Sequence, residues 1–113
     1  MKKTILLILA AALVLCMAAC SSDAAAKLDP VVAAETYLNS ANTFYNKADY
    51  DRAILDYDQA ILLNPSLVEA YNNRGYVYYI KGDMSKAIAD FEAALKLDPD
   101  YTNAKNNLAR AKK

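Results

Sequence analysis

Apolar side chains recur at steps of three and four along most of the chain after residue 33, which is the spacing of one face of an α-helix. The first such stripe consists of Ala34, Tyr37, Ala41, Phe44 and Ala48, and an equivalent stripe consists of Val68, Tyr71, Gly75, Tyr78 and Gly82. After a short break each stripe is followed by another, made of Tyr50, Ala53, Ile54, Tyr57, Ala60 and Ile61 or of Met84, Ala87, Ile88, Phe91, Ala94 and Leu95. The pattern therefore predicts four amphipathic helices arranged as two similar pairs.

The two pairs of helices form an internal repeat, in which residues 34–67 are the first unit and residues 68–101 the second. The two units align without a gap and share twelve identical positions, among them Asp49/Asp83 and Pro65/Pro99. Repeats of this length typically stack as supersecondary units, each of which buries the apolar face of its neighbour. The small residues Ala41 and Gly75 are expected to let the two helices of a pair approach closely.

Capping residues predict where the helices begin and end. Asp49 and Asp83 can each accept a hydrogen bond from the first turn of a second helix, and Asp29 followed by Pro30 favours a helix start near residue 30. Pro65 and Pro99 end the second helices because proline lacks an amide donor and restricts the residue before it. Ser66 and Asp100 are predicted to cap the helices that follow.

Residues 102–113 form half of a third unit. Ala104, Leu108 and Ala111 lie on one side of this predicted helix, and polar residues occupy the other side. A terminal helix with a polar outer face is what a helical stack needs at its end. The sequence thus predicts an all-α fold of about five helices.

This order of large aromatic, small residue, aromatic, Ala, aromatic, Ala and Pro resembles the tetratricopeptide repeat (TPR) family over residues 34–101. Ser40 and Arg74 stand where the family usually has Leu. The resemblance implies an α-solenoid of two repeats, 34–67 and 68–101, with a capping helix at 102–113. It also implies that the first helix of each unit lines a concave groove for a partner's peptide or helix. The matching positions here are Leu38, Asn39, Asn42, Tyr45, Asn46, Asn72, Asn73, Tyr76, Tyr79 and Ile80, together with Glu35, Glu69, Asn103, Asn106 and Asn107.

The carboxylate clamp of chaperone-binding TPR domains is not expected in this groove. Asn42 and Asn73 match the clamp asparagines, but Leu38 replaces the first clamp lysine. Asn103 and Asn107 stand where the later basic residues belong. Asn and Tyr side chains instead suggest recognition of peptide amides and of side chains that pack on aromatic rings.

The first residues of the chain predict a targeting segment rather than a part of the folded domain. A basic start, an apolar run and a small-residue end make residues 1–19 a signal peptide, and its uncharged stretch is too short to span a bilayer as a helix. The Met-Ala-Ala-Cys run resembles a bacterial lipoprotein signal, which implies lipidation of Cys20. Cys16 is the rival site, but it follows the bulky Leu15. Residues 20–30 then form the lipidated N-terminus and a tether, and residues 31–113 form the repeat domain.

Composition excludes several classes of function. The chain has 113 residues, no His, and 13 basic against 13 acidic residues. The usual general base and metal ligand is thus absent, and the charge balance excludes electrostatic binding of nucleic acid. Six acidic residues on the second helices are expected on an outward polar face, where they form neither a metal site nor a catalytic pair: Asp49, Asp51, Asp56, Asp58, Asp90 and Glu92. We therefore expect no enzyme, no cofactor and no metal.

The sequence predicts a membrane-anchored, non-catalytic adaptor that binds another protein of the cell envelope through the groove. The lipid bilayer is its second expected partner, reached through Cys20. Sorting to the outer membrane, facing the periplasm, is expected in a cell with two membranes, and otherwise the outer face of the plasma membrane. An alternative is a structural subunit that self-associates, because the front near Val31, Val32 and Leu38 has no preceding cap.

Overall fold

The computed structural model describes residues 28–113, which form five α-helices and no strand. The helices are α2 (Pro30–Asn46), α3 (Tyr50–Leu63), α4 (Val68–Lys81), α5 (Met84–Leu97) and α6 (Thr102–Ala111). The predicted all-α fold is confirmed. The predicted signal peptide at residues 1–19, Cys20 and the tether up to residue 27 lie outside the described residues.

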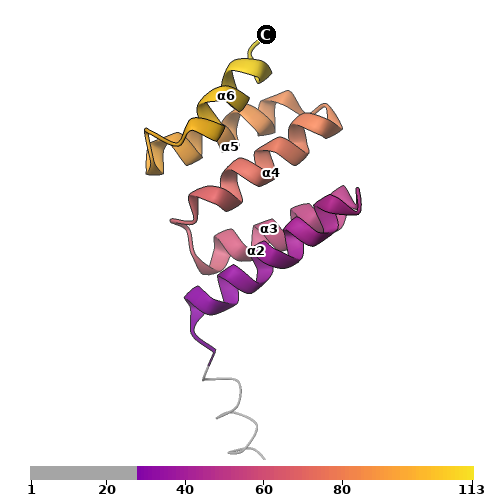
Figure 1. Ribbon diagram of the computed structural model, residues 1–113, viewed down its shortest axis with the longest axis vertical. Helices are drawn as coiled ribbons and strands as arrows, with labels where there is room; N and C mark the ends of the chain where they lie inside the picture. Colours follow the sequence, from indigo (N-terminus) through magenta and orange to yellow (C-terminus); the bar gives the residue numbers. More distant parts are fainter. Residues whose placement is uncertain (1–27) are drawn as a thin grey trace, which may run out of the picture.

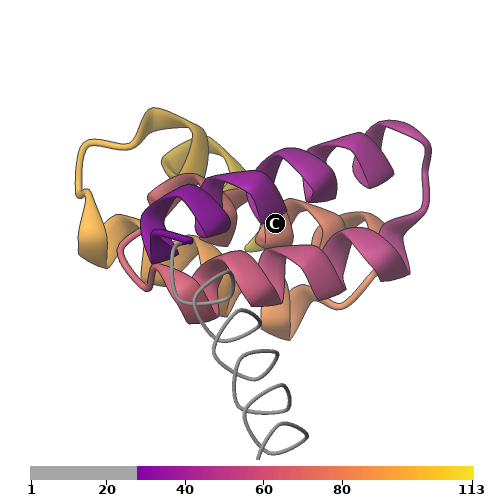
Figure 2. The same ribbon diagram turned by 90° about the horizontal axis from the view of Figure 1, so that it is seen from below.

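The helices stack as two antiparallel hairpins and a final single helix (Figure 1). Helices α2 and α3 pack on each other, as do α4 and α5, and α6 packs on α5. Figure 2 views the stack from its N-terminal end, where α2 and α3 run side by side in opposite directions. The two hairpins pack on each other mainly through α4 and α3, and α4 also makes a smaller contact with α2.

Three predicted caps are present at the helix starts. The side chain of Asp29 accepts a hydrogen bond from the amide of Val31 at 2.9 Å, and Pro30 opens α2. Asp49 and Asp83 accept from the amides of Arg52 and Lys86, each at 3.3 Å. These carboxylates satisfy amides that have no partner within the first turn of a helix.

The prediction that Ser66 and Asp100 cap α4 and α6 is wrong. The residues before these helices are Leu67 and Tyr101, and neither helix has a side-chain cap. The amide of Ser66 instead donates to Oδ1 of Asn64 at 3.1 Å, and the amide of Asp100 donates to Oδ1 of Asp98 at 3.0 Å. Each proline is thus enclosed by a turn held from the preceding Asn or Asp, as is typical of these side chains.

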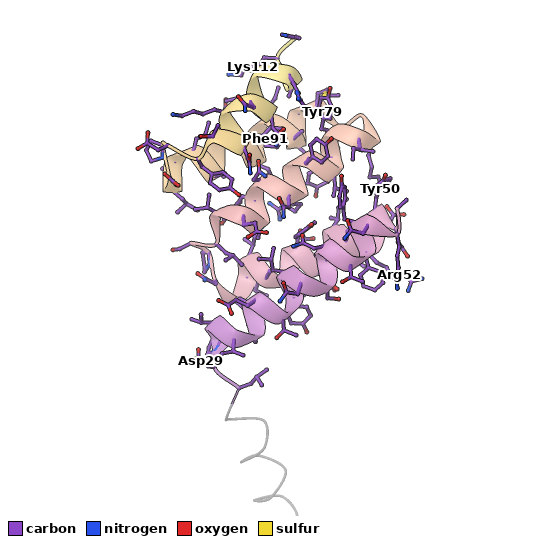
Figure 3. The ribbon with its side chains drawn as sticks, in the orientation of Figure 1. Asp29, Tyr50, Arg52, Tyr79, Phe91 and Lys112 are labelled. Carbon is purple, nitrogen blue, oxygen red and sulfur yellow. The ribbon has the colours of Figure 1, made fainter. Side chains whose placement is uncertain are left out.

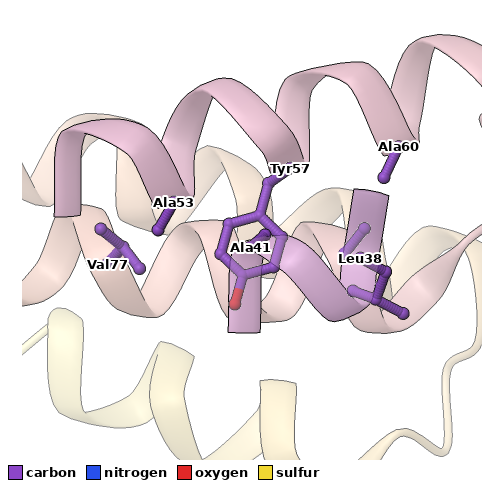
Figure 4. Close-up of a cluster of buried hydrophobic side chains, with 7 residues drawn as sticks. Leu38, Ala41, Ala53, Tyr57, Ala60 and Val77 are labelled. Atoms are coloured by element: carbon purple, nitrogen blue, oxygen red, sulfur yellow. The ribbon is translucent and has the colours of Figure 1, made fainter. Parts of the chain in front are cut away.

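Small residues bring the two helices of each hairpin close together. Five alanines of the two hairpins have no exposed surface: Ala41, Ala53, Ala60, Ala87 and Ala94. The largest fully buried side chains are Tyr57 and Phe91. Tyr57 projects from α3 toward the face of α2 that carries Ala41 and Leu38, with its hydroxyl at the far end of the ring (Figure 4). Burial of these rings supplies much of the apolar stabilisation in a thin core.

Candidate functional site

The first helix of each unit contributes its inner face to a groove of about 570 Å³. Helices α4 and α6 touch each other, and α4 also touches α2, so the three inner faces form one continuous surface. The groove is lined by Asn42, Tyr45, Asn46, Tyr57, Asn72, Asn73, Tyr76, Asn103, Asn106, Asn107 and Arg110. This lining contains amides and phenols, one guanidinium and no carboxylate.

Four asparagines form a continuous chain of hydrogen bonds across the floor of the groove. Nδ2 of Asn107 donates to Oδ1 of Asn72 at 3.0 Å, and Nδ2 of Asn72 donates to Oδ1 of Asn73 at 3.1 Å. Nδ2 of Asn73 then donates to Oδ1 of Asn42 at 3.1 Å. We call these four residues the amide chain, and it links α6, α4 and α2.

The amide chain is fixed at its far end by the buried Tyr57. The phenol hydroxyl of Tyr57 donates to Oδ1 of Asn42 at 2.5 Å, which joins α3 to the same network. Burial raises the pKa of Tyr57 well above its usual value, so the hydroxyl stays protonated and remains a donor. Oδ1 of Asn42 therefore accepts two hydrogen bonds, and only the Nδ2 group of this amide faces the groove without a partner among the described residues.

Four tyrosines form an aromatic row along one edge of the groove. The ring centroids of Tyr45 and Tyr50 are 6.2 Å apart, and Tyr45 meets Tyr76 edge to face at 6.1 Å. Tyr76 and Tyr79 stack at 6.0 Å with an angle of 14° between their planes. These separations fall in the range of favourable aromatic pairs. Figure 3 shows Tyr50 and Tyr79 at the same side of the stack, at the two ends of this row.

The structure brings most of the predicted groove residues together. The predicted residues that line the groove are Asn42, Tyr45, Asn46, Asn72, Asn73 and Tyr76, together with Asn103, Asn106 and Asn107 of α6. Tyr79 stacks on Tyr76 at the edge. Asn39 and Ile80 are exposed and lie outside the lining.

Leu38 does not belong to the groove, contrary to the prediction. Its side chain is 7% exposed and lies in the hydrophobic core with Ala41, Ala53 and Tyr57. Asn72, which stands at the same position of the next unit, is also buried at 5% exposed. Asn72 reaches the groove only because its amide joins the chain to Asn73 and Asn107.

Two groove residues, Tyr57 and Arg110, are missing from the prediction. Tyr57 had the pattern of a core residue and is 1% exposed, but it also lines the groove and its hydroxyl bonds to Asn42 there. Arg110 stands one repeat length after Tyr76 and two after Asn42, so the repeat register itself could have placed it. In the described part of the chain its guanidinium has no ion-pair partner.

The expectation that six acidic residues share an outward polar face is wrong for Asp90. This residue is 5% exposed and receives two hydrogen bonds from Arg74. Asp56 accepts a hydrogen bond from Ser40 at 2.5 Å, and Asp58 pairs with Arg74 at 2.8 Å. These carboxylates connect helices. Within residues 28–113 no group of three or more acidic or cysteine side chains is arranged to hold a metal ion.

The fold and the groove define a class of protein: an α-solenoid of helical hairpins that repeat in register along the chain and present the first helices as a concave surface. Sequence profiles described as "Tetratricopeptide repeat" and "TPR repeat" match residues 68–101 and 41–82, respectively. A search of curated proteins gives no match.

Solved structures with the same fold include TPR domains from human, Arabidopsis and yeast proteins. The second TPR domain of human RPAP3, solved with the HSP70 peptide SGPTIEEVD, is 34% identical over 71% of this chain and 67% of its own, with a TM-score of 0.68. The Arabidopsis OM64 TPR domain is 32% identical over 70% of this chain and 65% of its own, with a TM-score of 0.69. The TPR2B domain of yeast Sti1, solved with an Hsp70 peptide, is 26% identical over 70% and 63%, with a TM-score of 0.68. The chain belongs to the tetratricopeptide repeat family.

Proposed function

We propose that this protein is a membrane-anchored adaptor without catalytic activity, which binds a peptide segment of another cell-envelope protein in the groove. The single observation that carries the peptide part is the groove itself, whose lining of amides and phenols is held rigid by hydrogen bonds across four helices. A surface that is already ordered loses little entropy when it binds an extended segment. Similar TPR domains solved with bound peptides support this assignment.

The mode of binding differs from terminal-carboxylate capture with lysine and arginine. Leu38 is buried in the core, and the groove positions Asn103 and Asn107 carry amides instead of cations. Among residues 28–113, Arg110 is the one cation of the lining, so the set of basic side chains that holds a terminal carboxylate is incomplete, and we propose an internal stretch of the partner as the segment that binds.

Anchoring rests on the sequence of the first twenty residues. None of the five described helices is both long and apolar enough to cross a bilayer. We place the attachment at Cys20, through lipid on its thiol and on the mature N-terminus, because several acyl chains on one residue hold a protein to a membrane stably. In a cell with two membranes the proposed location is the periplasmic side of the outer membrane.

The groove assignment is tested by crosslinking in cells. A variant with Tyr45, Asn73 and Tyr76 all changed to Ala should lose the crosslinked partners that the natural chain captures. A matched variant with exposed residues outside the groove changed, Tyr37→Ala with Asn39→Ala, should keep them. Capture of the same partners by both variants contradicts the groove assignment. Labelling with radioactive palmitate tests the anchor: label should disappear in Cys20→Ser, and label that persists there would move the site to Cys16.

A second candidate function is supported by the exposed front of the stack. Val31 and Val32 are 51% and 53% exposed at the start of α2, and no helix precedes them among the described residues. A structural subunit could pack this end against a second copy. Analytical ultracentrifugation of the portion that starts at Ala24 tests this, and a stable monomer across the micromolar range would exclude it.

A further inference from the structure

We infer that the groove recognises two side chains of its peptide ligand. An aromatic or large apolar side chain binds at the row of Tyr50, Tyr45, Tyr76 and Tyr79, called the tyrosine row, and an acidic side chain binds at Arg110. This inference rests on the proposed peptide-binding function and adds the chemistry of the ligand to it. It follows from which groups of the groove are already used within the protein and which are left to bind a ligand.

The amide chain contributes little selectivity because it is largely occupied by its own hydrogen bonds. Asn72 uses its Oδ1 and one N–H of its Nδ2, and Asn73 uses its Oδ1 and donates to Asn42 and, at 3.4 Å, to Glu69. A ligand that competed for these groups would leave the buried Asn72 amide without partners, at a free-energy cost. The free Nδ2 group of Asn42 can donate to a backbone carbonyl, which every peptide has.

The tyrosine row offers the selective apolar surface of the groove. Tyr45 and Tyr76 both line it, are partly exposed, and are held in place by each other and by Tyr50 and Tyr79. Rings fixed in this way bury apolar area of a ligand with little loss of side-chain entropy. An aromatic side chain gains an additional ring contact, so Trp, Tyr or Phe is preferred over Leu.

Arg110 is the one charged residue of the lining and has no ion-pair partner among the described residues. Asn103, Asn106 and Asn107 surround it on α6 with uncharged amides. A guanidinium in these surroundings binds a carboxylate with charge-assisted hydrogen bonds. It therefore favours Asp or Glu in the ligand and disfavours Lys or Arg.

The repeat register sets the distance between the two side chains. Asn42, Tyr76 and Arg110 follow one another at intervals of one repeat length, so they occupy the same position on α2, α4 and α6. Neighbouring helices that pack directly lie roughly 8–10 Å apart, and an extended chain advances about 3.3 Å per residue. A ligand that crosses the helices thus places its acidic residue about three positions from its aromatic residue.

The chain contains no Trp, so a Trp in the ligand reports binding without a label. The probes are nonapeptides in a Gly/Ser background, acetylated and amidated at their ends, with one Trp and one Glu three positions apart in either order. They are titrated with the full-length protein in detergent micelles while Trp emission is recorded. In one of the two orders we expect saturable binding with a blue shift, weakened about three- to fivefold when Glu is replaced by Gln. A peptide with Gly in place of Trp carries no reporter, so it is added as a competitor, and it should displace the Trp peptide about tenfold more weakly than an unlabelled Phe peptide does.

Matched variants assign each preference to its residue. Arg110→Gln should bind the Glu and Gln peptides equally, whereas Arg52→Gln, which removes an exposed cation outside the groove, should keep the difference. Tyr76→Ala should lose the preference for Trp, and Tyr37→Ala should keep it. Circular dichroism of each variant checks that the helices are intact.

The outcomes separate this inference from the proposed function. Suppose that Tyr45→Ala or Asn42→Ala abolishes binding, but Arg110→Gln still prefers the Glu peptide over the Gln peptide by the same factor. This result overturns the acidic subsite and leaves the peptide groove standing. Equal affinity at separations of one, three and six residues overturns the register argument. If crosslinking finds no groove-dependent partner and no capped peptide of either order binds, the proposed function fails together with the inference.

Discussion

The guanidinium of Arg74 forms two hydrogen bonds with the carboxylate of Asp90, one from Nε at 2.9 Å and one from Nη2 at 2.7 Å. Its third contact runs from Nη1 to Asp58 of the preceding hairpin at 2.8 Å. Burial raises the pKa of Asp90, and the hydrogen bonds and positive charge of Arg74 reduce that rise. Burial alone would lower the pKa of Arg74, but the hydrogen bonds and negative charges of Asp90 and Asp58 raise it above its usual value. Arg74 therefore joins α3, α4 and α5, at a position where the TPR family usually carries Leu.

The first prediction concerns the loss of this arginine. Arg74→Leu leaves the Asp90 carboxylate buried without its partner, so the free energy of unfolding should fall by about 2–4 kcal/mol. Urea unfolding followed by circular dichroism measures the change. Asp58→Ala should cost less than about 1 kcal/mol, because the Asp58 side chain is 43% exposed.

A double variant tests whether the charge pair causes the effect. In Arg74→Leu with Asp90→Ala no buried carboxylate is left without a partner, and the remaining Asp58 is 43% exposed, so the loss should be clearly smaller than the sum of the two single losses. Additive losses would mean that Arg74 acts through packing on Tyr71, whose ring centroid lies 5.8 Å from the guanidinium carbon.

The second prediction concerns the close approach of α4 and α5 at Gly75. A Cβ at this position would lie 2.9 Å from both Cβ of Asp90 and Cε1 of Phe91, which are held in the core. Gly75→Ala should therefore destabilise the protein by about 1–3 kcal/mol, although Ala favours helix formation by up to about 1 kcal/mol. The matched control is Ala41→Gly in the first hairpin, which should cost only the propensity and a small cavity. A more stable Gly75→Ala variant in urea would show that the helices can move apart.

The third prediction compares the two turns that join the helices of each hairpin. Ala48 and Gly82 stand at the same position of the two repeats, and both have positive φ, 59° and 84°. In each turn the next Asp amide donates to a carbonyl five residues back, at 2.9 Å, as in a Schellman motif. The left-handed conformation is costly for Ala and free of strain for Gly.

Ala48→Gly should therefore raise the free energy of unfolding by about 0.5–1 kcal/mol, and Gly82→Ala should lower it by about 1 kcal/mol or more. No atom lies within 4 Å of a Cβ built on Gly82, so the second effect would come from the backbone alone. Thermal unfolding of the two variants side by side measures both changes. Opposite signs are required, and a stabilising Gly82→Ala contradicts the assignment.

Helical periodicity and the internal repeat were sufficient to predict the helices, the caps at Asp49 and Asp83 and the set of first helices that face the groove. These features depend on local spacing, which a sequence displays directly. The hydrophobic stripe also placed Ala41 and Gly75 correctly at the close contact between helices.

Contacts between distant residues could not be predicted in this way. Leu38 and Asn72 occupy the same repeat position and both are buried, through contacts with other helices that the spacing along one helix does not show. Asp90 looks like any surface carboxylate until Arg74, 16 residues away on another helix, is seen to pair with it. The amide chain likewise joins residues 31 and 35 positions apart, which only stacking brings together.

The last prediction concerns the pH dependence of stability and the buried hydroxyl of Tyr57. The side chain is 1% exposed, and burial raises its pKa above the usual value of 10.0. Above pH 10 the unfolded chain releases the Tyr57 proton while the folded chain retains it, so the free energy of unfolding should fall as pH rises, by up to about 1.4 kcal/mol per pH unit. Tyr57→Phe has no hydroxyl to ionise, so its stability lacks this decline with pH. The variant also loses the hydrogen bond to Asn42, which stabilises the fold by about 0.5–1.5 kcal/mol.

The natural chain should therefore be the more stable of the two at pH 8, and the difference should shrink or change sign by pH 11. Urea midpoints at both values measure this, with absorbance at 295 nm following ionisation of the phenols. Tyr37→Phe, which removes a phenol that is 38% exposed, controls for the loss of one tyrosine. A difference between the natural chain and Tyr57→Phe that stays constant from pH 8 to pH 11 would mean that the hydroxyl reaches solvent, and the amide chain would then lack the fixed donor that orients Asn42.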